Sequence, residues 1–407
     1  MYDYRQAIED IMRQEVESGR IAGAGYLLIQ GGRERYFGTC GYADRERQLP
    51  ISRDTIFRLF SMTKPITAAA VMLLVERGRL DLRDTVGQYL PCFRNQTVWN
   101  PEGEPLPIKR ETTIYDLLNM TSGIPYPENW EGCSPSGLLM DRLFRKLKKA
   151  QAQGQRLSTR EWMERIAEVP LVFQPGERWM YGLSADVLGA VAEVVTGKRY
   201  GAFLQEEIFR PLGMEDTGFY VPEDKQRRFA QNYIWNEETK ALEIYEDCNL
   251  GEYYGEDVSF ESGGAGLVST MEDYSHFAQM LLGGGVYNGV RILGEKTVAF
   301  MRQDRLSPRQ KGALDWDSNL GCGYGCLMRV LTDQGAAGTI GSLGEYGWDG
   351  WTGNYVTIDP ADDMVMLYFI QRCGYSSSSA LRRLRNITYG ALDRLENGMD
   401  SIVEGTE

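Results

Sequence analysis

The sequence predicts an α+β fold in which helices flank one antiparallel sheet and a mainly helical domain interrupts the chain of that sheet. Strand-like patterns lie near both ends of the 407-residue chain, and helical patterns fill most of the middle. We therefore expect a discontinuous sheet domain of residues 1–90 and 322–407, with residues 91–321 inserted as the helical domain. A small-molecule site is expected in the cleft between the two domains.

The first strands of this sheet follow an amphipathic helix. Residues 3–18 repeat apolar side chains at helical spacing. The next two runs, 23–30 and 34–43, are rich in apolar and aromatic residues, and Gly31-Gly32 between them favours a hairpin turn. The sheet is therefore expected to begin with a helix and a strand hairpin.

Helical patterns with glycine stops recur through the middle of the chain. A short helix is expected within residues 113–123 and a longer one over residues 185–196, each ended by a glycine. Residues 127–165 are polar and partly basic, with leucines at helical spacing, which is typical of a solvated helix face. Because they follow a Ser-Gly turn, they are also a candidate lid. Residues 231–245 predict a hairpin.

The C-terminal part of the chain returns to strands. Apolar, glycine-punctuated runs predict strands over residues 324–331, 350–358 and 364–371. A final helix is expected from about residue 378 to 396. These strands are the second half of the predicted sheet.

Composition limits the partners and the location of the protein. A net charge of −13 and a pI near 4.9 argue against nucleic acid or an anionic membrane as the main partner. The apolar runs are too short to span a bilayer, and the N-terminus lacks the pattern of a secretory signal. Seven scattered cysteines suit reduced thiols, and none is spaced for zinc. We expect a cytoplasmic protein; its oligomeric state stays open.

The histidine count restricts the catalytic chemistry. His276 is the only histidine, so a Ser-His-Asp triad would have to use it, and two-histidine metal motifs are impossible. It lies at the edge of the apolar stripe of a predicted helix, where a partly exposed structural residue is expected. Serine chemistry in this chain is therefore expected to proceed without histidine.

Ser61 and Lys64 are the candidate nucleophile and its partner. Pro65 marks the start of a helix that ends at Gly78, so Ser61 is expected at the first turn and Lys64 one turn along on the same face. A lysine whose pKa is lowered by burial can activate a serine hydroxyl, and the helix N-terminus can stabilise an oxyanion. The spacing alone equally fits a helix N-cap serine followed by a solvated lysine.

The sequence around this pair resembles the serine β-lactamase and penicillin-binding-protein superfamily, in particular the class C-like branch that includes the family VIII carboxylesterases. Several motifs occur in the family's order: Phe60-Ser61-Met62-Thr63-Lys64-Pro65, residues 113–123, Gln174-Pro175-Gly176 through Tyr181, Phe209 through Met214, and residues 262–270. The resemblance covers most of residues 5–395. It implies a β-lactamase-like fold with the nucleophile in the interdomain cleft.

The resemblance assigns roles to individual residues. Ser61 would be the acylated nucleophile, Lys64 its hydrogen-bonded partner, and Tyr181 the phenol or phenolate that relays the proton, with a pKa lowered by its neighbours. In the third motif, Trp348 takes the place of the family's lysine, as is frequent in family VIII esterases. Gly350 would let substrate approach the strand, and the backbone N–H of Trp351 would form an oxyanion hole with that of Ser61. Tyr126 and Tyr254 are two further expected substrate contacts.

Two departures from the β-lactamase pattern bear on the substrate. Leu183 stands where β-lactamases have an asparagine that binds the acylamino side chain. The third motif lacks the cation and hydroxyl that hold the carboxylate of penicillins. A site lined by Leu183 and Trp348 is expected to prefer neutral or hydrophobic acyl groups, with weak or no β-lactamase and peptidase activity.

Four functions remain in view. The first is a serine hydrolase that cleaves carboxylic esters through an acyl-Ser61 intermediate, without metal or cofactor. The second is an acyltransferase of the same fold, which hands the acyl group to an alcohol or amine. The third is a non-catalytic binding protein, and the fourth a D-amino-acid peptidase or amidase, in which the acidic loop 252–257 would bind an amine.

Overall fold

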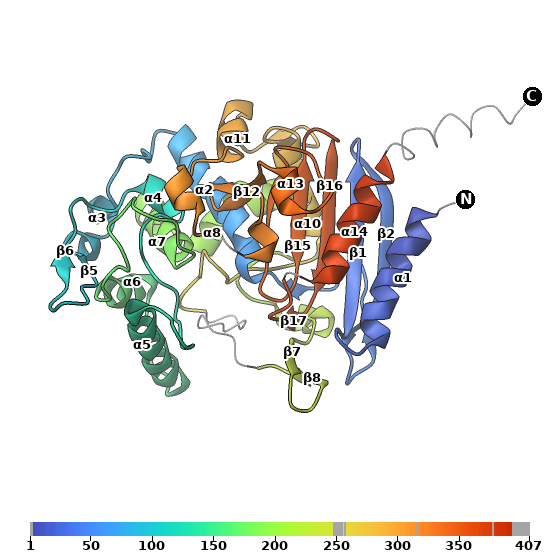
Figure 1. Cartoon of the computed structure of the whole chain (residues 1–407), viewed down its shortest axis with the longest axis horizontal. Helices are drawn as coiled ribbons and strands as arrows, with labels where there is room; N and C mark the ends of the chain where they lie inside the picture. The colour runs from blue at the N-terminus through green and yellow to red at the C-terminus, as the bar shows by residue number, and fades with distance from the viewer. Residues whose placement is uncertain (1–2, 247–254, 256–257, 315, 377, 393–407) are drawn as a thin grey trace, which may run out of the picture.

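An eight-stranded antiparallel sheet forms the centre of the molecule (Figure 1). The computed structural model describes residues 3–246, 255, 258–314, 316–376 and 378–392. The strand order is β12-β13-β14-β15-β16-β1-β2-β3. The strands are β1 (Gly23–Gln30), β2 (Arg33–Asp44), β3 (Leu49–Pro50), β12 (Cys322–Gly325), β13 (Met328–Leu331), β14 (Tyr346–Asp349), β15 (Tyr355–Asp359) and β16 (Met364–Ile370).

The two ends of the chain meet at the β1–β16 pair. Ala24 lies opposite Ile370, and the antiparallel register continues to Gln30 opposite Met364. The hairpin of β1 and β2 around Gly31-Gly32 is present as predicted. The predicted α+β fold, with N-terminal and C-terminal strands in one sheet, is therefore confirmed.

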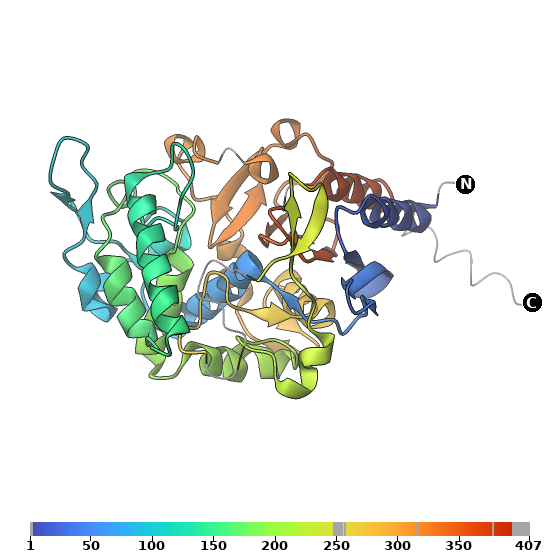
Figure 2. The ribbon, with the colours of Figure 1, turned by 90° about the horizontal axis from the view of Figure 1, so that it is seen from below.

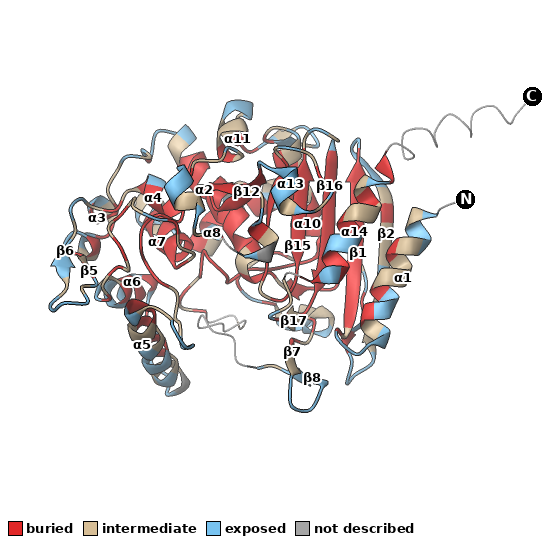
Figure 3. Ribbon diagram, viewed as in Figure 1, coloured by how far each residue is buried: buried red, intermediate tan, exposed pale blue. Residues whose placement is uncertain are grey.

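Both faces of the sheet are covered, and β16 shows how. Met364, Met366, Tyr368 and Ile370 pack against α1 (Tyr4–Glu17) and α14 (Ser379–Tyr389), while Val365, Leu367 and Phe369 join the main core with α2 (Thr63–Glu76) and α10 (Met271–Leu282). Alternate residues of a strand point to opposite faces, so a strand covered on both sides is apolar at every position. Figure 3 shows the buried strands between these helices.

The remaining helices lie mainly on the side of α2 (Figure 2). They are α3 (Val86–Tyr89), α4 (Ile114–Leu118), α5 (Pro135–Ala152), α6 (Thr159–Ala167), α7 (Ser184–Thr196), α8 (Tyr200–Leu204), α9 (Arg210–Leu212), α11 (Glu295–Met301), α12 (Pro308–Lys311) and α13 (Gln334–Ala337). Apart from α12 and α13, which bury no residue, these helices contribute apolar side chains to one continuous core with the sheet. The boundaries proposed from the sequence for two domains stay a prediction.

Small two- and three-stranded sheets connect these elements. They comprise β4 (Phe57–Arg58) with β9 (Val268–Ser269), β5 (Thr97–Val98) with β6 (Leu106–Pro107), β10 (Val286–Tyr287) with β11 (Val290–Arg291), and β7 (Tyr233–Asn236) with β8 (Ala241–Ile244) and β17 (Arg372–Cys373). The β7–β8 hairpin confirms the one predicted over residues 231–245. Across the described part of the chain, no helix has both the length and the apolarity needed to cross a membrane. The cytoplasmic location stays a prediction.

Two C-terminal strand predictions were wrong in detail. Residues 324–331 form a hairpin, β12–β13, rather than one strand, because Cys326 and Leu327 both adopt positive φ angles, of 46° and 61°. Two successive residues of this kind make a tight hairpin turn that is usually signalled by Asn-Gly, and neither residue gives that signal. The strand expected over 350–358 begins only at Tyr355, after a turn at residues 350–353.

Candidate active site

A strand-to-helix turn places Ser61 at the start of α2. The short pair of β4 with β9 anchors the chain just before it. Phe60 then adopts a positive φ of 46°, and a 3-10 turn over Phe60–Met62 leads into the helix. A non-glycine residue in the left-handed region costs about 1 kcal/mol, so the surrounding packing holds this turn. The turn directs Ser61 into a pocket that also contains Tyr181 and Trp348.

Lys64 lies one helical turn after Ser61 and is completely buried. Its Nζ donates hydrogen bonds to Ser61 Oγ (3.1 Å), to the Tyr126 hydroxyl (2.9 Å) and to the Gly264 carbonyl (2.7 Å). An uncharged amine has two hydrogens and one lone pair. The Gly264 carbonyl can only accept, whereas Ser61 can also donate, so the lone pair of the uncharged amine can face Ser61.

Burial lowers the pKa of Lys64 to about 7. The negative charges of Asp186 and Asp349 oppose this effect, with Asp186 contributing more. A buried ammonium loses its hydration, which disfavours the charged form. Lys64 therefore exists largely as an amine just above neutral pH, the form that can take the proton of Ser61.

The backbone partner of Lys64 is held by Asp186, on α7. The Asp186 carboxylate accepts hydrogen bonds from Ser262 Oγ (2.5 Å) and from the Gly264 N–H (3.2 Å). Thr67 Oγ1 donates to the neighbouring Gly263 carbonyl (2.6 Å). Residues 262–270 were noticed in the sequence only as a family motif. Nothing in their spacing from Lys64 could show that their backbone binds its amine.

Tyr181, which lines the pocket, also contacts the Lys64 amine. The centroid of its ring lies 4.6 Å from Lys64 Nζ, and its hydroxyl accepts a hydrogen bond of 3.0 Å from Trp348 Nε1. Burial raises the pKa of Tyr181, and hydrogen bonds with Ser61 and Trp348 only partly oppose this. The expected lowering of the Tyr181 pKa was therefore wrong, because burial of the phenol outweighs its hydrogen bonds with Ser61 and Trp348. Tyr181 is a neutral phenol at neutral pH.

The backbone amides of Ser61 and Trp351 border the same pocket. Among the described residues, neither N–H donates a backbone hydrogen bond. The ring of Trp351 packs edge-on against Phe60, with centroids 5.5 Å apart. Two free amides at one pocket are the donors that an oxyanion hole needs, and this role stays a prediction for Ser61 and Trp351.

Gly350 lines the pocket, but the reason for a glycine there differs from the one expected. A Cβ at Gly350 would lie 2.5 Å from the Leu59 carbonyl oxygen. The space beside its Cα is therefore filled by the chain itself, two residues before Ser61, rather than kept for substrate. The glycine allows the end of β14 to approach the turn that bears the nucleophile.

The pocket has a volume of about 250 Å³ and walls that are mainly aromatic. Its lining residues are Ser61, Tyr181, Trp316, Trp348, Asp349, Gly350, Trp351 and Ser376. Trp316 was missed in the sequence. Its ring packs edge-on against Tyr181, with centroids 4.9 Å apart, and 40% of the residue is exposed. A single tryptophan between short helices gives no sequence pattern that predicts this position.

The remaining predicted substrate contacts lie elsewhere. Leu183 precedes α7 and is only 1% exposed, within the core, so it is not among the lining residues. Tyr126 contacts Lys64 and packs against Tyr181, with ring centroids 5.2 Å apart, which makes it a neighbour of the Lys64 amine. Tyr254 and most of the acidic loop 252–257 lie outside the described residues. None of residues 127–165 lines the pocket, so their role as a lid stays a prediction.

His276 is placed as the sequence predicted. On α10, its Nδ1 lies 3.0 Å from the Leu212 carbonyl, its ring stacks on Tyr287, and its Nε2 is 3.6 Å from Glu272. It is not among the residues that line the pocket of Ser61. In the described ranges of the chain, no group of three or more His, Cys, Asp or Glu side chains is arranged to hold a metal ion.

Comparisons with known proteins agree with this geometry. Residues 8–388 match the family described as Beta-lactamase. Protein Rv1367c of Mycobacterium tuberculosis (strain ATCC 25618 / H37Rv) is 36% identical over 374 residues, which cover 89% of this chain and 88% of that protein. Esterase EstB of Burkholderia gladioli is 34% identical over 349 residues, covering 82% and 81%.

A solved structure extends the likeness to the whole fold. EstCE1, described as a hydrolase with promiscuous acyltransferase activity, is 28% identical and superimposes with a TM-score of 0.79, covering 95% of this chain and 98% of its own. The predicted resemblance is therefore confirmed over nearly the full length. The chain belongs to the Beta-lactamase family and is a serine hydrolase with a β-lactamase-like fold.

Proposed function

We propose that this protein hydrolyses carboxylic esters through an acyl-Ser61 intermediate. The observation that supports this most is the hydrogen bond between Ser61 Oγ and the buried amine of Lys64, at a pocket with two free backbone amides. Relatives described as esterase and as hydrolase, EstB and EstCE1, support the same reaction class.

The proposed reaction uses the groups already placed. Uncharged Lys64 takes the proton of Ser61 as Oγ attacks the ester carbonyl, and the amides of Ser61 and Trp351 stabilise the oxyanion. The tetrahedral intermediate collapses and the alkoxide leaves with a proton from Tyr181, which regains one from the Lys64 ammonium. Water then attacks the carbonyl of the acyl-enzyme, and its proton is transferred by the same residues as in the first step. The carboxylic acid is released.

The pocket favours neutral acyl groups. Its charged lining side chain is Asp349, and no lysine or arginine occurs among the lining residues. Three tryptophans supply apolar walls, while a carboxylate on the substrate would meet a negative charge without a cation to bind it. We therefore propose uncharged, small-to-medium acyl esters as substrates and penicillins as poor ones.

Acyl transfer to an alcohol is the second candidate. EstCE1 is described as having promiscuous acyltransferase activity, and the exposed Trp316 leaves one side of the pocket open to an acceptor. Both reactions share the acyl-Ser61 intermediate and differ only in whether water or an alcohol attacks it.

Initial rates with p-nitrophenyl acetate, butyrate and octanoate, and with a chromogenic cephalosporin, test the proposal. We expect kcat/KM for the esters to exceed that for the cephalosporin by orders of magnitude, and Ser61→Ala to abolish ester turnover. A faster reaction with the cephalosporin, or full ester turnover by Ser61→Ala, would contradict it. Adding ethanol or butanol and analysing the products by mass then measures the share of acyl transfer.

A further inference from the structure

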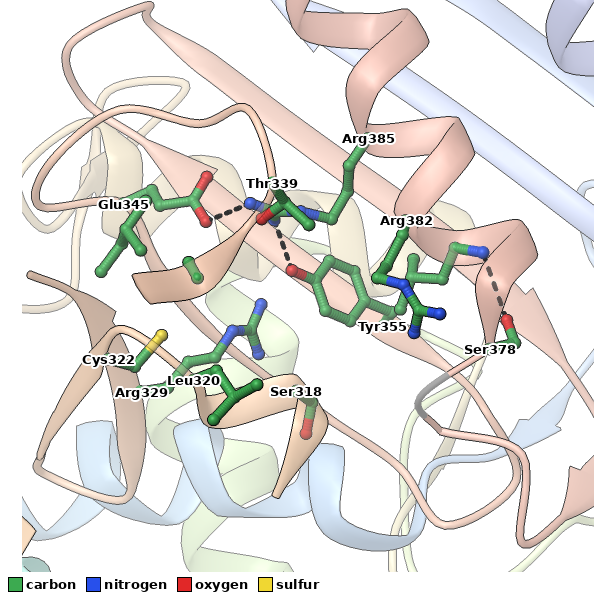
Figure 4. Close-up of a pocket in the computed structure, with 13 residues that line it drawn as sticks. Ser318, Leu320, Cys322, Arg329, Thr339, Glu345, Tyr355, Ser378, Arg382 and Arg385 are labelled. Atoms are coloured by element: carbon green, nitrogen blue, oxygen red, sulfur yellow. Dashed lines mark hydrogen bonds and ion pairs between the residues drawn. The ribbon is translucent and has the colours of Figure 1, made fainter. Parts of the chain in front are cut away.

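A second cavity lies between the sheet and α14 and shares no lining residue with the pocket of Ser61 (Figure 4). Its volume is about 50 Å³, and one water needs only about 10–15 Å³ measured in this way. The cavity therefore has room for a group of a few heavy atoms. Its lining residues are Ser318, Leu320, Cys322, Arg329, Leu331, Ala337, Thr339, Glu345, Tyr355, Ser378, Leu381, Arg382 and Arg385.

Arg329, on β13, is the unusual residue of this cavity. It is 3% exposed, and its Nη2 donates to the Val356 carbonyl (3.1 Å) and to Thr357 Oγ1 (3.2 Å). Its Nη1 is buried and has no hydrogen-bond partner among the described residues. Its guanidinium also forms no ion pair with any of these residues. Figure 4 shows this guanidinium extending into the space enclosed by the drawn residues.

Two further arginines line the cavity. Arg385 is buried and forms an ion pair with Glu345, at 2.5 Å, so these two charges balance. Arg382 is exposed and lines the rim of the cavity. The 11-residue helix α14 begins at this rim and adds the positive end of its dipole.

A buried guanidinium with an unused donor is costly, because each buried donor normally has a partner. Glu345 does not fill this role: its carboxylate binds Arg385 and the Tyr389 hydroxyl, and among the described residues Arg329 Nη1 has no partner. The planar fork of arginine matches the oxygens of carboxylates and phosphates. The missing partner is therefore expected to be an anion that enters from the rim.

We propose that this cavity is a binding site for a small oxyanion, with Arg329 as its buried donor and Arg382 at its entrance. The site is separate from the pocket of Ser61 and does not depend on the proposed ester hydrolysis. The limited volume selects ions the size of acetate or phosphate and excludes larger ligands.

Thermal unfolding and titration calorimetry of the whole protein test this site. Sodium phosphate and sodium acetate are compared with sodium chloride at equal ionic strength, in a buffer free of oxyanions. We expect at least one oxyanion to raise the unfolding midpoint in a saturable way, beyond chloride, with one ion bound per chain. Phosphate alone would indicate a tetrahedral ligand and acetate alone a carboxylate, and either result supports the site.

Variants locate the binding. Arg329→Gln removes the buried donor and should weaken binding about tenfold or more, while Arg382→Gln at the rim should weaken it about threefold. Arg383→Gln, the neighbouring exposed arginine of α14 outside the cavity, should bind as the wild type does. If Arg329→Gln does not fold, the comparison of anion binding by Arg382→Gln and by Arg383→Gln decides whether the cavity is the binding site.

Two results would overturn the proposal. One is a stabilisation by phosphate and acetate no greater than that by chloride. The other is binding that Arg382→Gln and Arg383→Gln change to the same extent, which would indicate screening of surface charge rather than a site.

Discussion

Gly350 lies so close to Leu59 that a Cβ at the glycine would be 2.5 Å from the leucine carbonyl oxygen. The contact joins the end of β14 to the turn before Ser61. Trp351 follows the glycine directly, so the contact also sets the distance between the two amides of the proposed oxyanion hole. Asn354 Nδ2 and Gln371 Nε2 donate to the next carbonyl back, that of Arg58, at 2.8 Å and 3.1 Å, and hold the same junction.

Gly350→Ala should therefore impair both stability and catalysis. The added methyl group forces the two backbones apart, which costs about 1–3 kcal/mol of unfolding free energy and moves the Trp351 amide away from the oxyanion. We expect a lower kcat with a smaller change in KM, measured with p-nitrophenyl butyrate. Gly103→Ala, where a Cβ would meet nothing within 4 Å, is the matched control. Wild-type kcat in Gly350→Ala would contradict this view of the junction.

The pH dependence of ester hydrolysis should follow the buried lysine. The pKa of Lys64 is lowered to about 7, and the uncharged amine is the reactive form. Activity is therefore expected to rise as the pH increases through about 7 and to level off above it. The measurement is kcat/KM for a neutral ester at constant ionic strength. A profile that is flat between about pH 5.5 and pH 9 would show that no group with a pKa near that of a buried lysine controls the reaction.

Neutralising either nearby carboxylate should move this profile to lower pH. Asp186 and Asp349 both raise the pKa of Lys64, and Asp186 has the larger effect. Removing a negative charge disfavours the ammonium form, so Asp186→Asn and Asp349→Asn should each lower the pKa of Lys64, in that order of size. The acid limb of kcat/KM reports the shift. Movement to higher pH in either variant would be incompatible with this electrostatic arrangement.

The hydrogen bond from Trp348 to Tyr181 should matter for turnover. Trp348→Phe removes the donor. Because that hydrogen bond lowers the pKa of Tyr181, its loss should raise this pKa. We expect kcat to fall by about tenfold if the bond contributes about 1.4 kcal/mol in the transition state. Trp179→Phe is a matched control. Trp179 is also buried and stacks on Tyr181 with centroids 6.3 Å apart, but its Nε1 has no hydrogen-bond partner in the described structure. Equal losses in the two variants would assign the effect to packing alone.

The sequence predicted the parts of the fold and site that depend on local patterns. Pro65 located the start of α2, Gly197 the end of α7, and continuous apolar runs the central strands. The spacing of Ser61 and Lys64 correctly placed their side chains within hydrogen-bonding distance. These features depend on residues within a few positions of one another, where helix and strand geometry is fixed.

Long-range contacts could not be predicted in this way. The backbone of Gly264, which binds Lys64, is 200 positions away in the chain, and Trp316 reaches Tyr181 from a segment without a regular pattern. Leu183 was expected to face substrate because of its motif position, yet it lies in the core. The lowered pKa was assigned to Tyr181 as well as Lys64, whereas burial lowers it only for the lysine. Burial depends on the whole folded chain, so it cannot be predicted from a single motif.

Intact-protein mass after brief exposure to a p-nitrophenyl ester tests the central claim most directly. The measurement compares the wild type with Ser61→Ala, quenched in acid within the first turnovers. We predict an added mass equal to the acyl group in the wild type and none in the variant. Ester turnover in the wild type without any acyl adduct, or the same adduct in Ser61→Ala, would contradict catalysis through an acyl-Ser61 intermediate.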